Sequence, residues 1–229
     1  VLWDVYKRQT VDDKYFTYEE LEKKIKKLQT DKDGSLIILY AQNKDEQYTY
    51  IESAKEKGYE VLLLDSPIIP HLMQKLESKK EKIKFSRVDS DTLENLIKKD
   101  EEVISKLTDE EKEKLKPMIE TAVENEKYTV QLEALDSNSM PFMLAQPEFM
   151  RRMKEMQQTG GGAMGNLPDM YSLIVNTNHE LVGKILNTRT EKKRNSLIKQ
   201  SIDLAKLSQN NLTGKDLTEF INRSIDLIK

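Results

Sequence analysis

The sequence predicts an α+β protein in which a small αβα unit with a parallel three-stranded sheet precedes a mixed α/β domain that ends in helices. Between residues 35 and 88, two apolar runs and one alternating run, each of strand length, are separated by two helical patterns, and this order is typical of parallel strands. Past residue 90 the pattern changes to charged helices and short alternating strands, and the final helices carry wide apolar faces. We therefore expect one domain at 14–90 and a second at 91–229.

The composition is that of a helix-rich protein with broad solvated faces. Of 229 residues, 37% are hydrophobic and 34% charged, and the net charge is −3. No basic stripe stands out, so a nucleic-acid partner is not expected. The lack of cysteine excludes disulfides, thiolate metal sites and thiol nucleophiles. No apolar run approaches the roughly 20 residues that cross a bilayer and no secretory signal is visible, so we expect a cytoplasmic protein without a membrane partner.

The amino-terminal end precedes the first predicted element. Residues 1–13 hold the only tryptophan but lead into no clear element, and we interpret them as a non-native scar and a disordered lead. Thr17 and Glu20 have the spacing of a capping box, which predicts a charged helix that runs to about Leu28. A turn at 30–34 separates this helix from the first strand.

The αβα unit follows from periodicity and from helix boundary signals. Two apolar runs of strand length predict buried strands, and a third, alternating run predicts another strand. An amphipathic pattern closed by Gly58 predicts a helix between the first two. Ser66 and Pro67 suit the N-cap and first position of a second helix, whose stripe would hold Ile68, Leu72 and Leu76. The predicted strands are 35–40, 59–64 and 83–88, and the first helix is 47–57.

The second domain begins with two helix starts. The residues at 91–94 and 108–111 fit capping boxes, and charged helices are expected to run to about residue 125. Alternating or short apolar runs then predict strands at 128–135, 142–145 and 171–176, with a helix that begins at Pro147. Three helices end the chain: a short one at 181–186, a second that contains Leu197 to Ala205, and a third after Thr213.

Methionine is concentrated in one part of the chain. Seven of the nine methionines lie between residues 140 and 170, ahead of or beside a triple glycine. Methionine is unbranched and polarisable, so a surface rich in it adapts to partners of different shape. The alternative is that these side chains fill gaps in the core. On the helix after Pro147, one stripe would carry Phe149, Met150, Met153 and Met156, with Arg151, Arg152 and Lys154 opposite.

Two motifs resemble parts of enzyme active sites, but each lacks a feature that its function requires. GGGAMG at 160–165 matches a dinucleotide-binding fingerprint, but it follows a helix instead of a strand. HELVG at 179–183 begins like a zinc-protease helix, but Gly183 stands where the second histidine ligand must be. No G-x-S-x-G or phosphate-loop pattern is present. We therefore predict no catalytic residue, no metal site and no enzyme activity for this chain.

Several separated blocks of the sequence resemble one protein family. These are QYTYIESAKEKGYEVL at 47–62, which continues into LLDSPI, FSRVDSD at 85–91, EFMRRM at 148–153, and VNTNH at 175–179. Together they are similar to the end of the middle domain and the C-terminal domain of the ninety-kilodalton heat-shock chaperones. The similarity is to the bacterial branch, high-temperature protein G, of the Bacteroidetes type. It covers roughly residues 14–229.

The resemblance implies a chaperone fragment. In the family, the ATPase domain that holds ATP and Mg²⁺ lies upstream, so no cofactor is implied for this fragment. An amphipathic segment contacts unfolded client proteins, and Phe142, Phe149, Met150, Met153 and Met156 match it. The last two long helices form a four-helix dimerisation bundle with a second protomer. Here they would contribute Leu197, Ile198, Ile202, Ala205, Leu217, Phe220, Ile221, Ile225 and Ile228.

The sequence leaves three hypotheses. The first is a chaperone fragment that forms homodimers and binds unfolded clients. The second is an enzyme on the αβα unit, but the strand ends carry Asp65-Ser66-Pro67 and Asp89-Ser90-Asp91 where a glycine loop is needed. The third is a structural adaptor that dimerises without binding clients. The chain departs from the family at 187–195, where related bacterial members carry a longer charged insertion.

Overall fold

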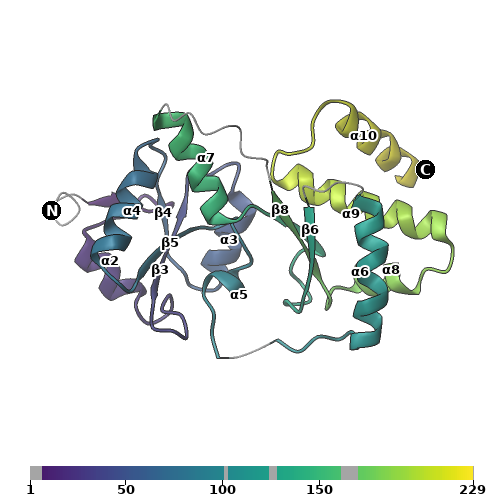
Figure 1. The fold of residues 1–229 in the computed structure, drawn as a ribbon, viewed down its shortest axis with the longest axis horizontal. Helices are drawn as coiled ribbons and strands as arrows, with labels where there is room; N and C mark the ends of the chain where they lie inside the picture. Colours follow the sequence, from purple (N-terminus) through teal and green to yellow (C-terminus); the bar gives the residue numbers. More distant parts are fainter. Residues whose placement is uncertain (1–6, 101–102, 124–127, 161–169, 229) are drawn as a thin grey trace. The chain divides into compact units, whose positions relative to one another are not determined.

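The computed structural model describes residues 7–100, 103–123, 128–160 and 170–228. The chain forms two compact units, shown with their elements in Figure 1. The first unit contains residues 1–101 together with 146–167, and the second contains 102–145 together with 168–229. A single helix, α7 (Glu148–Gly160), therefore belongs to the first unit although the strands before and after it belong to the second.

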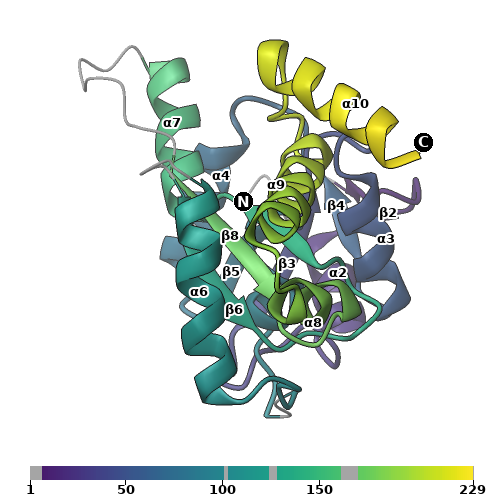
Figure 2. The ribbon, with the colours of Figure 1, turned by 90° about the vertical axis from the view of Figure 1, so that its right-hand side faces the viewer.

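A parallel three-stranded sheet forms the centre of the first unit. Its order is β4 (Val61–Leu63), β3 (Leu36–Ala41), β5 (Ile83–Arg87). All six residues of β3 are buried, as expected for a central strand covered on both faces. Helices α3 (Tyr48–Glu56) and α4 (Ile69–Lys79) lie on opposite sides of the sheet (Figures 1 and 2). The predicted αβα arrangement is confirmed.

Side chains of alternate β3 residues pack with two helices in one core. Leu36, Ile38 and Tyr40 share it with residues of α4 and of α2 (Tyr18–Ile25). The capping box predicted for α2 is confirmed, because the Thr17 amide donates to Glu20 Oε2 at 2.8 Å and the Glu20 amide donates to Thr17 Oγ1 at 3.3 Å. The helix ends at Ile25, earlier than the expected position near residue 28.

The start of α4 differs from the prediction. The helix begins at Ile69 with Ile68 as N-cap, so the assignment of Ser66 and Pro67 to its first positions is wrong. A turn in which the Ile69 amide donates to Ser66 O at 3.0 Å precedes the helix, and Pro70 occupies its first turn. The buried stripe is accordingly Ile69, Met73 and Leu76, while Ile68 is exposed.

A short hairpin occupies part of the segment where no element was expected. Strands β1 (Arg8–Gln9) and β2 (Tyr15–Phe16) pair antiparallel around a turn in which Asp13 has a φ of 60°. Thr10 is buried and forms an antiparallel bridge with Leu62. The Val11 amide donates to Val61 O at 3.0 Å, so the hairpin covers the edge of β4.

The second unit is built on a mixed sheet of order β6-β8-β7. Strand β6 (Tyr128–Glu133) runs parallel to β8 (Tyr171–Asn176), and β7 (Phe142–Ala145) runs antiparallel to it. Helices α6 (Asp109–Val123), α8 (Glu180–Asn187) and α9 (Glu191–Ser208) pack their apolar residues into its core. Thr108 and Glu111 cap α6 reciprocally, as predicted, whereas α5 (Leu93–Leu96) in the first unit is only one turn long.

Buried asparagines at the end of β8 hold the second unit together. Asn176 Nδ2 donates to Asp136 O at 2.8 Å, and its Oδ1 accepts the Leu135 amide at 3.2 Å. Asn178 accepts the Lys106 amide at 2.6 Å and donates to two backbone carbonyls. His179 is the N-cap of α8, since its Nδ1 accepts the Leu181 amide at 3.0 Å. The VNTNH block is therefore structural in this unit.

Helix α10 (Gly214–Ile228) packs across α9 at the end of the described chain (Figure 2). Arg223 of α10 forms an ion pair with Asp203 of α9, whose side chain is buried. Gln200 Nε2 donates to Ser224 Oγ at 2.8 Å. These polar contacts, together with the buried ring of Phe220, fix how α10 packs on α9.

Candidate functional site

Helix α7 packs its charged face against the first unit and leaves its apolar face partly exposed. At 100° per residue, Glu148, Arg151, Arg152 and Glu155 fall within one sector of the helix, and Phe149, Met150, Met153 and Met156 fall in another. Arg151 is 3% exposed, whereas Phe149 is 70% exposed. This is the reverse of an ordinary surface helix, in which the apolar stripe faces the core.

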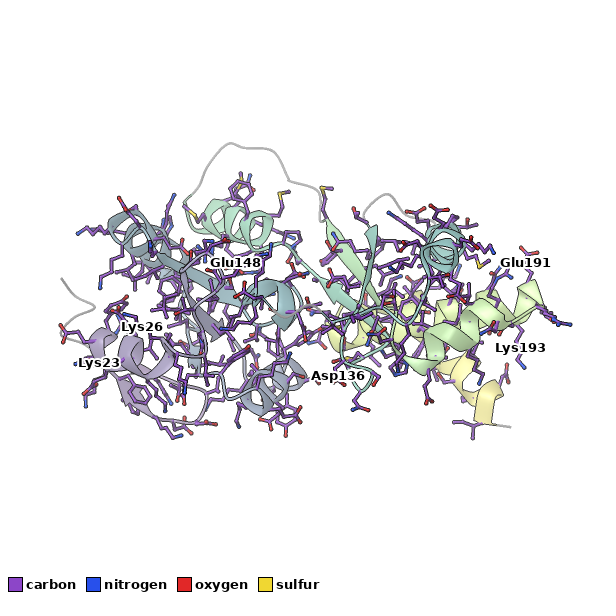
Figure 3. The ribbon with its side chains drawn as sticks, turned by 90° about the horizontal axis from the view of Figure 1, so that it is seen from below. Lys23, Lys26, Asp136, Glu148, Glu191 and Lys193 are labelled. Atoms are coloured by element: carbon purple, nitrogen blue, oxygen red, sulfur yellow. The ribbon has the colours of Figure 1, made fainter. Side chains whose placement is uncertain are left out.

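A network of ion pairs and hydrogen bonds joins this charged face to strand β3. The Tyr40 hydroxyl donates to Glu148 Oε1 at 2.7 Å, and Arg151 Nη2 donates to the same oxygen at 2.7 Å. Arg151 also contacts the Tyr40 hydroxyl and pairs with Glu155 through Nη1 at 2.5 Å. Figure 3 labels Glu148, which projects from the start of α7 toward the strands of the first unit.

The same face of α7 binds strand β5 and helix α4. Arg152 Nη1 donates to Glu77 Oε2 at 2.8 Å, and its Nη2 donates to the Phe85 carbonyl at 2.5 Å. Glu148 Oε2 accepts the Arg87 amide at 3.1 Å, and Glu77 Oε1 accepts the Phe85 amide at 2.7 Å. Three side chains, Glu77 of α4 and Glu148 and Arg152 of α7, therefore bind backbone groups of β5 that are not paired with another strand.

The electrostatics of this network keep its groups in fixed protonation states. Burial disfavours the Glu148 carboxylate, but the guanidinium groups of Arg151 and Arg152 hold the pKa of that carboxyl below its ordinary value. Burial and the neighbouring Glu148 carboxylate raise the pKa of the Tyr40 hydroxyl far above its ordinary value. At physiological pH, Glu148, Arg151 and Arg152 are therefore ionised and Tyr40 is neutral.

The structure separates the residues predicted to contact clients. Phe149, Met150, Met153 and Met156 lie together on α7, where Phe149 is exposed and the methionines are half-buried. Phe142 does not join them, because it lies on β7 with its side chain 1% exposed in the core of the second unit. Met164 and the glycines at 161–165 lie outside the described residues.

The residues predicted for dimerisation fall into two groups. Ile198, Ile202, Ala205 and Phe220 are buried within their own unit, and Leu197 and Leu217 are half-buried. Ile221, Ile225 and Ile228 of α10 are exposed. Sequence analysis did not name Leu204 and Leu207 of α9, which are also exposed. Helices α9 and α10 thus expose five apolar side chains: Leu204, Leu207, Ile221, Ile225 and Ile228.

Sequence reasoning also missed the residues that hold α7. Tyr40, Glu77 and Arg87 lie far from α7 in the sequence and looked like ordinary parts of a strand and a helix. One signal was present: opposite charges at 148, 151, 152 and 155 recur at the spacing of one helix face, where they can pair with one another. Sequence analysis placed only Arg151 and Arg152 of this set, together with Lys154, opposite the apolar stripe.

Among the described residues, no group of three or more His, Cys, Asp or Glu side chains could hold a metal ion. In the same residues, no helix is both long enough and apolar enough to span a membrane.

Comparison with known proteins finds relatives that share one name. The chain is 36% identical to "Chaperone protein HtpG" of Bacteroides thetaiotaomicron, in a match that covers 95% of this chain and 42% of that protein. It is 39% identical to "Chaperone protein HtpG" of Porphyromonas gingivalis over 86% of this chain and 30% of that protein. The chain thus spans less than half the length of these curated relatives. No family model matches the chain.

The Bacteroides match also shows a difference in length. It extends over 286 residues, whereas 95% of this 229-residue chain is about 218 residues, so the relative holds on the order of 68 residues that this chain lacks within the matched region. In this chain α8 ends at Asn187 and α9 begins at Glu191, which leaves three residues between them. The polar stretch 187–195 thus comprises the end of α8, this connection and the start of α9.

Proposed function

Because the chain belongs to the HtpG family of chaperones and corresponds to part of their length, we propose that it is the client-contact and dimerisation part of such a chaperone. In the whole protein, an upstream domain would hydrolyse ATP with Mg²⁺, and this part would bind unfolded or partly folded proteins. A homodimer and a cytoplasmic location belong to the same proposal.

The outward apolar stripe of α7 carries the client-binding proposal. Phe149 is 70% exposed on a helix whose opposite, charged face is buried. An exposed aromatic ring beside three methionines offers a deformable apolar surface, which suits many different unfolded segments better than one folded partner. Each side chain contributes modestly, so affinity for any one client should be weak.

The dimer proposal depends on the apolar surface of α9 and α10. Its members Leu204, Leu207, Ile221 and Ile225 are each between 41% and 48% exposed, and Ile228 is 86% exposed. Burying them against a second copy would remove this area from water. An isologous two-fold contact is the commonest arrangement for such a surface.

Client binding is tested with a reduced and alkylated protein that cannot refold and that carries a fluorescent label. Its anisotropy should rise when the chain is added, and the double variant Phe149→Ser/Met153→Ser should bind it several-fold more weakly. A matched control is Ile68→Ser/Tyr48→Ser, which removes two exposed apolar side chains from the same unit. Equal binding by the α7 variant and the control would contradict the proposal and leave the adaptor hypothesis.

A further inference from the structure

The charged face of α7 fits a socket on the first unit, which we define as Tyr40, Glu77, Arg87 and Gln42. Each socket residue contacts α7: Tyr40 and the Arg87 amide bind Glu148, Glu77 binds Arg152, and Gln42 Nε2 donates to Glu155 Oε1 at 3.3 Å. The contacts run along the helix for two turns. The attachment therefore extends along the helix and involves one face of α7 only.

The socket includes the free edge of the sheet. β5 is an edge strand, and its pairing with β3 places Phe85 and Arg87 so that their outward backbone groups find no neighbouring strand. Glu77 and Glu148 accept the two amides, and Arg152 donates to the Phe85 carbonyl. Side chains thus replace the missing strand, which is one way in which proteins protect an edge from pairing with other chains.

The chemistry of the socket decides which face of α7 is buried. Burial of the stripe that contains Phe149 would be favoured by the hydrophobic effect if the surface below α7 were apolar. The socket instead presents a hydroxyl, charged groups and backbone amides, whose hydrogen bonds only the charged face can complete. A buried ionic network of this kind adds little net stability, but it penalises the wrong orientation, because each buried charge would lose its partner.

We propose that Tyr40 and Glu77 are positioning residues that hold α7 on the first unit with its apolar stripe turned outward. The client-contact surface is thereby carried by the first unit, although the chain segments on both sides of α7 belong to the second. The socket keeps the stripe ordered before a client arrives, so binding does not have to order the helix. The claim that the stripe binds clients rests on the proposed function, whereas the claim that the socket holds α7 does not.

The test changes the socket and leaves α7 untouched. Tyr40→Phe removes only the hydroxyl, and Glu77→Gln keeps the shape and an oxygen for the Phe85 amide while it removes the charge that faces Arg152. The matched control is Tyr48→Phe/Glu56→Gln, the same two chemical changes at exposed positions of α3. Both double variants and the unmodified chain are compared by amide hydrogen exchange and by binding of the labelled unfolded protein.

In the socket variant, exchange of the α7 amides should accelerate roughly tenfold or more, since two hydrogen bonds to charged groups are weakened. Binding of the unfolded protein should weaken about threefold or more, because the helix must then be ordered on binding. The control should match the unmodified chain in both measurements. Unchanged α7 exchange in the socket variant would contradict the attachment.

Faster α7 exchange with unchanged or tighter client binding would contradict the positioning role, since it would mean that the stripe works equally well when released. If the unmodified chain binds no unfolded protein, the proposed function fails and the positioning role fails with it. The exchange comparison still decides whether the socket holds α7. The two failures are therefore distinguishable.

Discussion

Replacing Ile221 and Ile225 of α10 with serine should dissociate the proposed dimer. The two side chains are 48% and 47% exposed, so about half of each remains to be buried by a partner. Full burial of an isoleucine contributes about 1.5–3 kcal/mol, and half of this is roughly 0.7–1.5 kcal/mol per side chain. A two-fold dimer contains four such side chains, which gives about 3–6 kcal/mol. The dissociation constant should therefore rise by about two to four orders of magnitude.

The assay is sedimentation velocity over a concentration series up to about 100 μM, where even weak dimers assemble. The unmodified chain should shift from monomer to dimer within the series, and the variant should stay monomeric. Ile68→Ser/Ile104→Ser is the matched control, because these isoleucines are also exposed but lie on neither α9 nor α10. Circular dichroism should show the same helix content for all three proteins. A variant that dimerises as well as the unmodified chain would refute the reasoning.

Three further predictions concern the fold and the attachment of α7. Asn178→Ala should lower the free energy of unfolding by about 2–4 kcal/mol, seen in chemical denaturation, because it leaves buried backbone groups of the second unit without partners. The pKa of Glu148 is lowered in the folded state, so the contribution of its carboxylate to stability is complete above its ordinary value of 4.5 and is lost as pH falls through the folded-state value. Protection of the α7 amides from hydrogen exchange, taken relative to the unfolded-chain rate at each pH, should therefore be lower in acid than at pH 7, and equal protection would contradict this. Thr17→Ala should cost about 1 kcal/mol through the capping box of α2, whereas Thr49→Ala, within α3, should cost less in the same thermal unfolding experiment.

Local sequence signals predicted most of the fold. The three strands of the first unit, β7 and β8 appear within a few residues of their expected positions, because short apolar runs and, in β5, alternation of apolar and polar residues are local signals of a strand. The capping boxes at Thr17 and Thr108 are present because both of their hydrogen bonds form within four residues of chain. The α4 start was wrong because two prolines, Pro67 and Pro70, compete for the first turn.

The candidate site was less predictable because its contacts are distant in sequence. Tyr40 and Glu148 are separated by 108 residues, and no local pattern reveals that one binds the other. The helical periodicity of α7 identified its two faces but not which face is buried, since amphipathicity alone assigns the apolar face to the core. Phe142 was expected to contact clients together with the α7 stripe. It lies on β7 instead, and its side chain is buried in the core of the second unit.

The outward presentation of the α7 stripe is tested most directly at Phe149. The chain has no cysteine, so Phe149→Cys introduces a single thiol whose reaction rate with a water-soluble maleimide reports its exposure. We predict a rate close to that of Ile68→Cys, a similarly exposed position, and slowing of the Phe149→Cys reaction alone when saturating unfolded protein is added. A slow reaction at position 149 in the free chain, or a rate that unfolded protein leaves unchanged, would contradict the account.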